Sequence, residues 1–259
     1  MATKAKRSET GGTLGFLLKL ALFVFLFRSL IVAPFSIPSE SMLPKLLIGD
    51  YLLVTKWNYG YTRWSFPWGI VPFDGRVLAS RPERGDVAVF RSNPGFDHDV
   101  IKRVIGLPGD TVQMRRGQLF LNGRPVPKER VADFTLPVSP NYGCPSQYRD
   151  GGSCRYARFR ETLPGGPSYF VLDQGNFPQA DDTGVYTVPA EHLFMMGDNR
   201  DNSGDSRFSP PVGFDFVPMT SLEGKAALIF FSTDGSASWL RPWTWFTAAR
   251  PERTGGTFE

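Results

Sequence analysis

A serine-rich turn contains the residues of this chain that are best suited to hydrolytic chemistry. The turn reads IPSESMLP, residues 37–44, and directly follows the most apolar segment of the sequence. The hydroxyl of Ser41 is by itself a weak nucleophile, and it attacks a carbonyl carbon only when a base lies within hydrogen-bonding distance. Another part of the chain must therefore supply that base.

The candidates for the base are two histidines and one lysine. His98 lies between two aspartates in FDHDV and His192 follows a glutamate, so neither has clearly apolar surroundings. Lys102 lies in the stretch VIKRVIG, where strand alternation places Val100, Lys102 and Val104 on one face. Desolvation on such a face lowers the pKa of a lysine, which favours Lys102 as the base. The alternative is a lysine that protects a sheet edge from aggregation.

A third polar region reads GDNRDNSGDSR, residues 197–207. Its ordinary interpretation is a turn in which Asp and Asn side chains bond their own backbone. The functional alternative is a scaffold, with the Ser203 hydroxyl orienting the lysine and an Asp205–Arg207 pair holding the loop. Arg103 lies on the opposite strand face from Lys102, and we expect it to face solvent or to pair with a carboxylate.

The remaining pattern is typical of an all-β fold. Short apolar runs are separated by turns rich in the 27 glycines and 22 prolines of the chain. Asn122-Gly123 within GQLFLNGRPV predicts a hairpin turn. We expect the other main strands within residues 49–57, 84–92, 99–110 and 168–173, at the start of 191–207, and within 225–232.

An apolar run at residues 14–35 is long enough to cross a bilayer as a helix. Lys19 and Arg28 lie within it, about 13 Å apart along a helix, so their side chains can extend toward opposite membrane surfaces. No small-residue cleavage site ends the run and its apolar residues surround the helix, which favours an uncleaved anchor over a signal peptide or a surface helix. Basic residues precede the run, which predicts a cytoplasmic N-terminus.

These observations predict five regions. We expect a cytoplasmic tail at 1–13, a transmembrane anchor at 14–35, a catalytic β-domain at 36–110 and 191–250, an inserted β-rich subdomain at 111–190, and a tail at 251–259. Cys144 and Cys154 lie in the insert. They lack the further ligands of a zinc site, so a disulfide is favoured outside the cytoplasm, with two free thiols as the alternative.

Composition bears on partners and cofactors. The net charge is +4, but Lys and Arg are scattered and form no basic-aromatic stripe, which argues against nucleic-acid binding. The sequence has neither a metal-ligand cluster nor a glycine-rich phosphate loop, so we expect no metal and no organic cofactor.

Four stretches in a fixed order resemble the bacterial signal peptidase I family, which comprises membrane-anchored serine-lysine endopeptidases that remove signal peptides. They read IPSESMLP, GDYLLVTKW, RGDVAVF followed by DVIKRVIGLPGD, and MGDNRDNSGDSR. The aromatic stretch NYGYTRWSFP resembles the alphaproteobacterial-type members in particular. The resemblance implies a signal-peptidase-type β-fold behind one N-terminal transmembrane helix.

The resemblance also implies roles for individual residues. Ser41 matches the acyl-forming nucleophile, Lys102 the general base, and Ser39 a hydroxyl of the oxyanion hole. Ser203 matches the group that orients the lysine, while Asp205 and Arg207, with Arg103, match structural supports. The positions that match an apolar substrate pocket are Phe35, Ile37, Pro38, Met42, Leu46 and Ile101.

As a signal peptidase, the enzyme would cleave precursor proteins after a small-x-small site and bind them as an added β-strand. Its partners would be these precursors and the lipid bilayer, near the secretion translocon. Its location would be the cytoplasmic (inner) membrane, with the catalytic domain on the periplasmic side. Two alternatives stay open on motifs alone: a same-fold maturation peptidase dedicated to a conjugation system, and a non-enzymatic anchored β-domain that binds envelope proteins.

Overall fold

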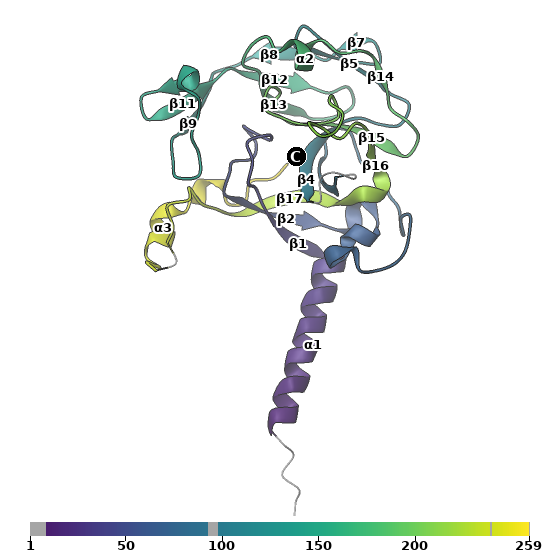
Figure 1. The fold of residues 1–259 in the computed structure, drawn as a ribbon, viewed down its shortest axis with the longest axis vertical. Coiled ribbons are helices and arrows are strands. Elements are labelled where there is room, and N and C mark those ends of the chain that lie inside the picture. Colours follow the sequence, from purple (N-terminus) through teal and green to yellow (C-terminus); the bar gives the residue numbers. More distant parts are fainter. Residues whose placement is uncertain (1–8, 93–97, 239, 259) are drawn as a thin grey trace, which may run out of the picture.

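A single long helix projects from a β-rich body in the computed structural model, which describes residues 9–92, 98–238 and 240–258 (Figure 1). Helix α1 spans Glu9–Leu30. Its side chains are apolar and exposed around most of its circumference, and the stretch Gly12–Leu30 is long and apolar enough to span a bilayer. At 1.5 Å per residue, this stretch is about 28 Å long, close to the thickness of the hydrocarbon core.

The helix ends five residues before the boundary that hydropathy predicted, because it stops at Leu30 and not at Phe35. Residues Val32–Ser36 instead form strand β1, which pairs antiparallel with β2, Asp50–Thr55. Pro34 cannot continue a helix, but it is tolerated here because β1 is an edge strand. Both segments are apolar, so hydropathy alone could not separate them.

One antiparallel sheet of seven strands forms the centre of the body, in the order β1-β2-β17-β3-β4-β15-β16. The strands beyond the first pair are β17 (Leu222–Ser232), β3 (Val87–Arg91), β4 (Asp99–Gly106), β15 (His192–Met196) and β16 (Val217–Pro218). Parts of the chain before residue 111 and after residue 191 therefore share one sheet.

Three smaller sheets are built from residues 111–187 and lie on the side of the central sheet away from α1 (Figure 1). The first is β14-β5-β6-β7, with strands Tyr186–Thr187, Thr111–Arg115, Gln118–Leu121 and Arg124–Pro125. The second is β13-β12-β8, with Ser168–Leu172, Arg158–Thr162 and Lys128–Arg130. The third is β10-β11-β9, with Arg149–Asp150, Ser153–Tyr156 and Phe134–Pro137.

The predicted hairpin is confirmed, because β6 and β7 pair around Asn122 and Gly123. Both turn residues have positive φ, 52° and 74°, as a type I′ turn requires. The remaining helices are short: α2 (Pro178–Asp181), α3 (Thr244–Ala248), and the 3₁₀ turns Trp57–Tyr59, Arg63–Ser65, Pro67–Gly69, Ser146–Tyr148, Met219–Ser221 and Pro251–Arg253.

The inserted sheets do not have a hydrophobic core of their own. Ile105 and Phe194 of the central sheet pack in one cluster with residues of β5, β6 and β13. Leu43, two residues after Ser41, packs in another cluster with Leu136 and Cys154 of the insert. The boundaries expected at residues 110 and 190 therefore separate sheets but not cores.

A disulfide joins Cys144 to Cys154 in this insert. The described residues after 250, where a tail was expected, pack against the body. Arg253 reaches the buried carboxylate of Asp50, with Nη2 2.5 Å from Oδ2, and Phe258 packs against the core of the central sheet. A buried carboxylate needs a cation partner, and this need holds the last described residues against the body.

Candidate active site

Ser41 and Lys102 meet in space although 61 residues separate them. Ser41 lies in the turn after β1, and Lys102 lies in β4. Lys102 Nζ hydrogen bonds with Ser41 Oγ at 2.7 Å and donates to the carbonyl of Ile101 at 3.1 Å. Both side chains are buried, with relative exposures of 8% for Ser41 and 4% for Lys102. The pair therefore has the contact that a hydroxyl nucleophile needs with its base.

The surroundings of Lys102 favour its neutral form. The pKa of this lysine is lowered to about 8, chiefly by burial; the carboxylates of Asp205 and Asp198 oppose the shift, and the nearby Arg207 adds to it. A lysine in water has a pKa near 10.4. The buried amine thus has the affinity for protons that general-base catalysis near neutral pH requires.

Ser39 lies beside this pair, on the open side of the turn. Its Oγ is 3.4 Å from Ser41 Oγ, and its side chain lines a cavity together with Lys102. Ser39 is exposed, so its hydroxyl is accessible from the cavity. It is therefore placed where a donor to the developing oxyanion would act.

The cavity next to Ser39 is mostly apolar. Of the six expected pocket residues, Phe35, Ile37, Pro38 and Ile101 line it. Met42 and Leu46 do not line this cavity: both are buried in the core of the central sheet, in the cluster that also contains Ile37. The backbone N–H of Leu46 donates to the Met42 carbonyl at 2.9 Å, and this helical turn directs both side chains inward.

Neither histidine joins the pair of Ser41 and Lys102. His98 is exposed and lines the cavity at its β4 side. His192 lies in β15, near the opposite end of the central sheet from β1. Its Nδ1 is 2.8 Å from the carbonyl oxygen of Ala190. Among the described residues, no group of three or more His, Cys, Asp or Glu side chains could hold a metal ion.

The polar stretch 197–207 forms a buried scaffold. Arg207 Nε donates to Asp205 Oδ1 at 2.9 Å, and Arg207 Nη2 donates to the Arg200 carbonyl at 2.6 Å. Asp205 also accepts from the backbone N–H of Gly197 at 3.0 Å. Burial raises the pKa of Asp205, but Arg207 and these hydrogen bonds outweigh it, so the pKa lies below its usual value. The pair thus ties both ends of the loop together.

Ser203 takes a position that its expected role does not explain. Its Oγ is buried and has no hydrogen-bond partner among the described residues, whereas Lys102 bonds to Ser41 and to the Ile101 carbonyl. The expected contact between Ser203 and the lysine is therefore missing here. Gly197 allows this close packing, because a Cβ there would lie 2.2 Å from Ser203 Oγ and 2.5 Å from the Ser41 carbonyl oxygen.

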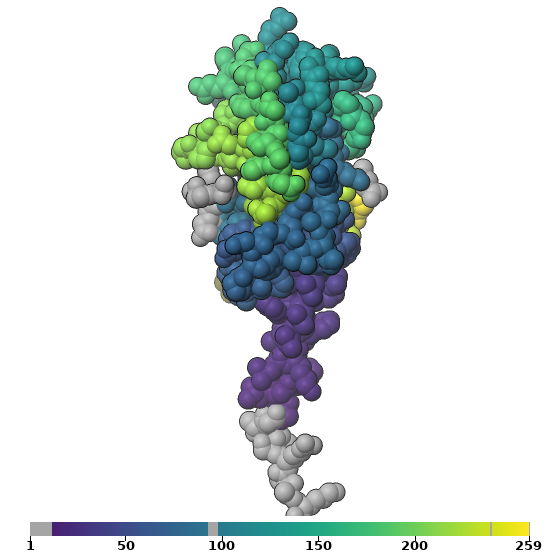
Figure 2. All heavy atoms as spheres, turned by 90° about the vertical axis from the view of Figure 1, so that its right-hand side faces the viewer, coloured from purple at the N-terminus to yellow at the C-terminus, as the bar shows by residue number. Residues whose placement is uncertain are grey.

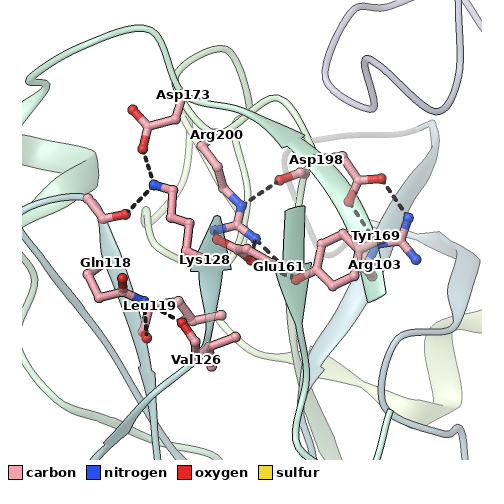
Figure 3. Close-up of polar contacts among 12 residues, drawn as sticks. Arg103, Gln118, Leu119, Val126, Lys128, Glu161, Tyr169, Asp173, Asp198 and Arg200 are labelled. Carbon is pink, nitrogen blue, oxygen red and sulfur yellow. Dashed lines mark hydrogen bonds and ion pairs between the residues drawn. The ribbon is translucent and has the colours of Figure 1, made fainter. Parts of the chain in front are cut away.

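Arg103 pairs with a carboxylate that sequence reasoning did not single out. Its Nε and Nη2 donate to the two oxygens of Asp198 at 2.8 and 2.6 Å, and its guanidinium stacks over the Tyr169 ring at 4.2 Å (Figure 3). Arg103 is 2% exposed, so of the two expected arrangements the structure has the carboxylate pair and not the solvent-facing side chain. Asp198 belongs to the stretch 197–207, and that density of polar residues was the only signal for it.

A second buried pair continues the network into the insert. Arg200 Nη1 donates to Glu161 Oε1 at 2.7 Å, and the Tyr169 hydroxyl donates to Glu161 Oε2 at 2.9 Å (Figure 3). Tyr169 therefore links the Arg103 pair to the Arg200 pair. Strand β4, which carries Lys102, is thus tied to the loop after β15 by the Arg103–Asp198 pair, and that loop is tied to the insert by the Arg200–Glu161 pair.

The chain is similar to known peptidases over most of its length. The model of a family described as signal peptidase, peptidase S26, matches residues 12–231. The signal peptidase I of Rickettsia typhi is 37% identical over 214 residues, which is 80% of this chain and 74% of that protein. The signal peptidase I of Rickettsia conorii is 34% identical over 243 residues, covering 89% and 84% of the two chains.

A solved structure is also similar in sequence. The crystal structure of a signal peptidase I from Enterococcus faecalis is 27% identical and covers 56% of this chain and 97% of its own, with a TM-score of 0.30.

Proposed function

The chain belongs to the signal peptidase family of peptidase S26, and from this premise we propose that Ser41 and Lys102 are the nucleophile and the general base of its reaction. The protein is a serine endopeptidase that removes signal peptides from precursor proteins. The observation that carries the assignment is the 2.7 Å contact between Ser41 Oγ and the buried Nζ of Lys102. The two alternatives named from the motifs alone have no support among the relatives.

The proton transfers of the reaction use these two groups and water. Neutral Lys102 accepts the proton of Ser41 as Oγ attacks the carbonyl carbon of the scissile bond. When the tetrahedral intermediate collapses, the carbon–nitrogen bond breaks and the lysine gives its proton to the leaving amine. Water then attacks the acyl-enzyme, Lys102 takes a proton from it, and Ser41 Oγ leaves with that proton, which releases the signal peptide as a carboxylate.

Two open strand edges beside the cavity support binding of the substrate as an extended strand. β1 is the edge strand of the central sheet. In β4, only Arg103, Val104 and Gly106 pair with β15, so within the described sheet the segment 99–102 has one edge without a partner strand. Main-chain hydrogen bonds to such edges are independent of side chains, and the apolar cavity then selects small residues near the scissile bond.

Helix α1 supports the proposed placement at a membrane. We infer that it crosses the cytoplasmic membrane once, with the basic residues Lys4, Lys6 and Arg7 on the cytoplasmic side. The body would then lie on the periplasmic side, where precursors leave the translocon. The disulfide suits that compartment, because disulfides persist under oxidising conditions.

Four single variants of the full-length enzyme test the assignment on a short peptide with a small-x-small site. Ser41→Ala and Lys102→Ala should each lower kcat/KM by several orders of magnitude, while His98→Ala and His192→Ala should retain most activity. Thermal unfolding of each variant checks that the fold is intact. Substantial cleavage by a folded Lys102→Ala variant would disprove the lysine as base.

A further inference from the structure

A second cavity adjoins the active-site cavity and runs along helix α1, and we propose that it holds the apolar helix of the signal peptide during cleavage. Phe35 and Asp99 line both cavities, so the two are neighbours. The inference rests on the proposed function, because it assigns a place to the substrate upstream of the scissile bond. The proposed binding site is called the helix groove below.

One wall of the helix groove is a single face of α1. Leu17, Leu20, Ala21, Val24 and Phe25 line it, and their spacing of three and four residues places them on one side of the helix. The smallest of them, Ala21, lies in the middle and leaves room between larger neighbours. From Leu17 to Arg28 the wall is about 16 Å long, which matches a helix of about 11 residues. The apolar core of a signal peptide has about 7–15 residues.

The opposite wall is the aromatic segment after β2, in which Trp64 and Trp68 lie in two 3₁₀ turns and Phe66 lies between the turns. The Phe66 ring packs against Phe25 of α1 with centroids 6.4 Å apart, which closes one side of the groove. The Thr62 hydroxyl caps the first turn and donates to the Leu222 carbonyl of β17 at 2.9 Å. Figure 2 shows the blue part of the chain that contains this segment directly above purple α1. The wall is therefore preformed and anchored to the central sheet.

The end of the groove nearest the active site is charged. Arg28, Lys56 and Arg91 line it together with Asp99 and Glu223. Lys56 pairs with Glu223 at 3.3 Å and Arg91 with Asp99 at 3.0 Å, and Arg28 adds a third cationic residue to the two acidic ones. A signal-peptide helix that runs toward the scissile bond would present its C-terminus here. Its last four carbonyl groups lack partners within the helix, and cations stabilise that end.

The groove thus matches the three parts of the substrate in order. Its apolar part lies beside α1, its cationic part lies where the substrate helix must end, and the open strand edges follow where the chain must be extended. A lipid acyl chain could also contact apolar walls, but it would not need the neighbouring active-site cavity. We therefore assign the groove to the peptide, and lipid occupancy is a contrary outcome of the test.

The first test compares two substrates with full-length enzyme in liposomes. One substrate is a precursor with a complete signal peptide, and the other is a short peptide with only the cleavage site. Ala21→Trp fills the middle of the groove and should raise KM for the precursor about tenfold, while kcat/KM for the short peptide stays unchanged. The matched control is Leu22→Trp, because the next residue lies about 100° around the helix and does not line the groove.

The second test detects contact directly. The only two cysteines of the chain form a disulfide, so an introduced cysteine is the sole free thiol. In the Ser41→Ala background, Val24→Cys should form an oxidative crosslink with a precursor that carries one cysteine in its apolar core. Phe23 does not line the groove, so Phe23→Cys should form no such crosslink.

The outcomes separate the inference from the proposed function. In one contrary outcome, Ala21→Trp weakens cleavage of both substrates equally or of neither. Either result would show that the helix groove does not bind the signal peptide and is filled by lipid or serves packing alone. Equal crosslinking at residues 23 and 24, or none at either, would also show that the helix groove does not bind the signal peptide. Loss of short-peptide cleavage in Ser41→Ala and Lys102→Ala tests the catalytic pair independently of the groove.

Discussion

At the scale of single residues, the central feature is a lysine that burial converts into a base. Among the described residues, Lys102 has no carboxylate as a hydrogen-bond partner; it contacts Ser41 Oγ and one carbonyl group. The carboxylates that raise its pKa, Asp205 and Asp198, are engaged by Arg207 and Arg103. This division keeps the negative charges from holding a proton on the lysine.

The pKa of Lys102 predicts the pH dependence of cleavage. Only the neutral amine can accept the serine proton, and its pKa is about 8. The kcat/KM for a short peptide should therefore rise about tenfold per pH unit below this value and level off above it. A pH profile at constant ionic strength measures this. A limb near the pKa of histidine, about 6.5, would instead implicate His98 or His192.

Ser39 predicts a loss in the chemical step and not in binding. Ser39→Ala removes one donor to the oxyanion, so kcat should fall by about 10²–10³ while KM changes little. The hydroxyl is exposed, so the melting temperature should not change. Steady-state kinetics on the short peptide separate the two parameters. A rise in KM with unchanged kcat would show that Ser39 contributes to substrate binding instead.

At the scale of secondary-structure elements, buried ion pairs hold β4 against the loop after β15. Arg103 is adjacent to Lys102 in β4, and its partner Asp198 follows β15. Tyr169 of β13 contacts both this pair and the Arg200–Glu161 pair. The position of the base therefore depends on charges supplied by the loop and by the insert.

Breaking the Arg103 pair should destabilise the body strongly. Asp198→Ala leaves a buried guanidinium without its carboxylate, and such losses cost about 3–5 kcal/mol. Denaturant unfolding measures the change. The matched control is Asp150→Ala, which breaks the exposed Arg155–Asp150 pair and should cost less than about 1 kcal/mol. Equal effects of the two variants would show that burial of the pair adds nothing.

At the scale of the whole molecule, the insert and the catalytic turn share packing. Cys154 is fully buried and lies in one cluster with Leu43 and Leu47, which follow Ser41 in the chain. The disulfide therefore stabilises a loop whose inner side supports the turn that carries the nucleophile. The insert forms sheets separate from the central one, and its packing supports the turn that carries Ser41.

Removing the disulfide should lower stability without changing the chemistry. The bond closes a loop between residues 10 apart, so Cys144→Ala with Cys154→Ala should lower the free energy of unfolding by about 3 kcal/mol in the chain-entropy model. Unfolding of this variant and of the reduced wild-type protein should agree. An unchanged denaturation midpoint would mean that packing alone holds the loop.

The sequence by itself determined the features that local chemistry and periodicity encode. The apolar run predicted α1, the alternation around Lys102 predicted a strand with an unusual lysine, and Asn122-Gly123 predicted a hairpin turn. Each of these features depends on residues that are close together in the chain, so the sequence alone is enough to predict it. The choice of Lys102 over the histidines came from the same source, namely its apolar flanking residues.

Only the tertiary structure decided how distant segments meet. It ended α1 at Leu30, turned Met42 and Leu46 into the core, paired Arg103 with Asp198, and left Ser203 without the lysine as a partner. Hydropathy cannot separate an apolar helix from the apolar strand that follows it. The partner of a buried charge depends on which strands become neighbours, and in this chain those strands lie about 90 residues apart in sequence.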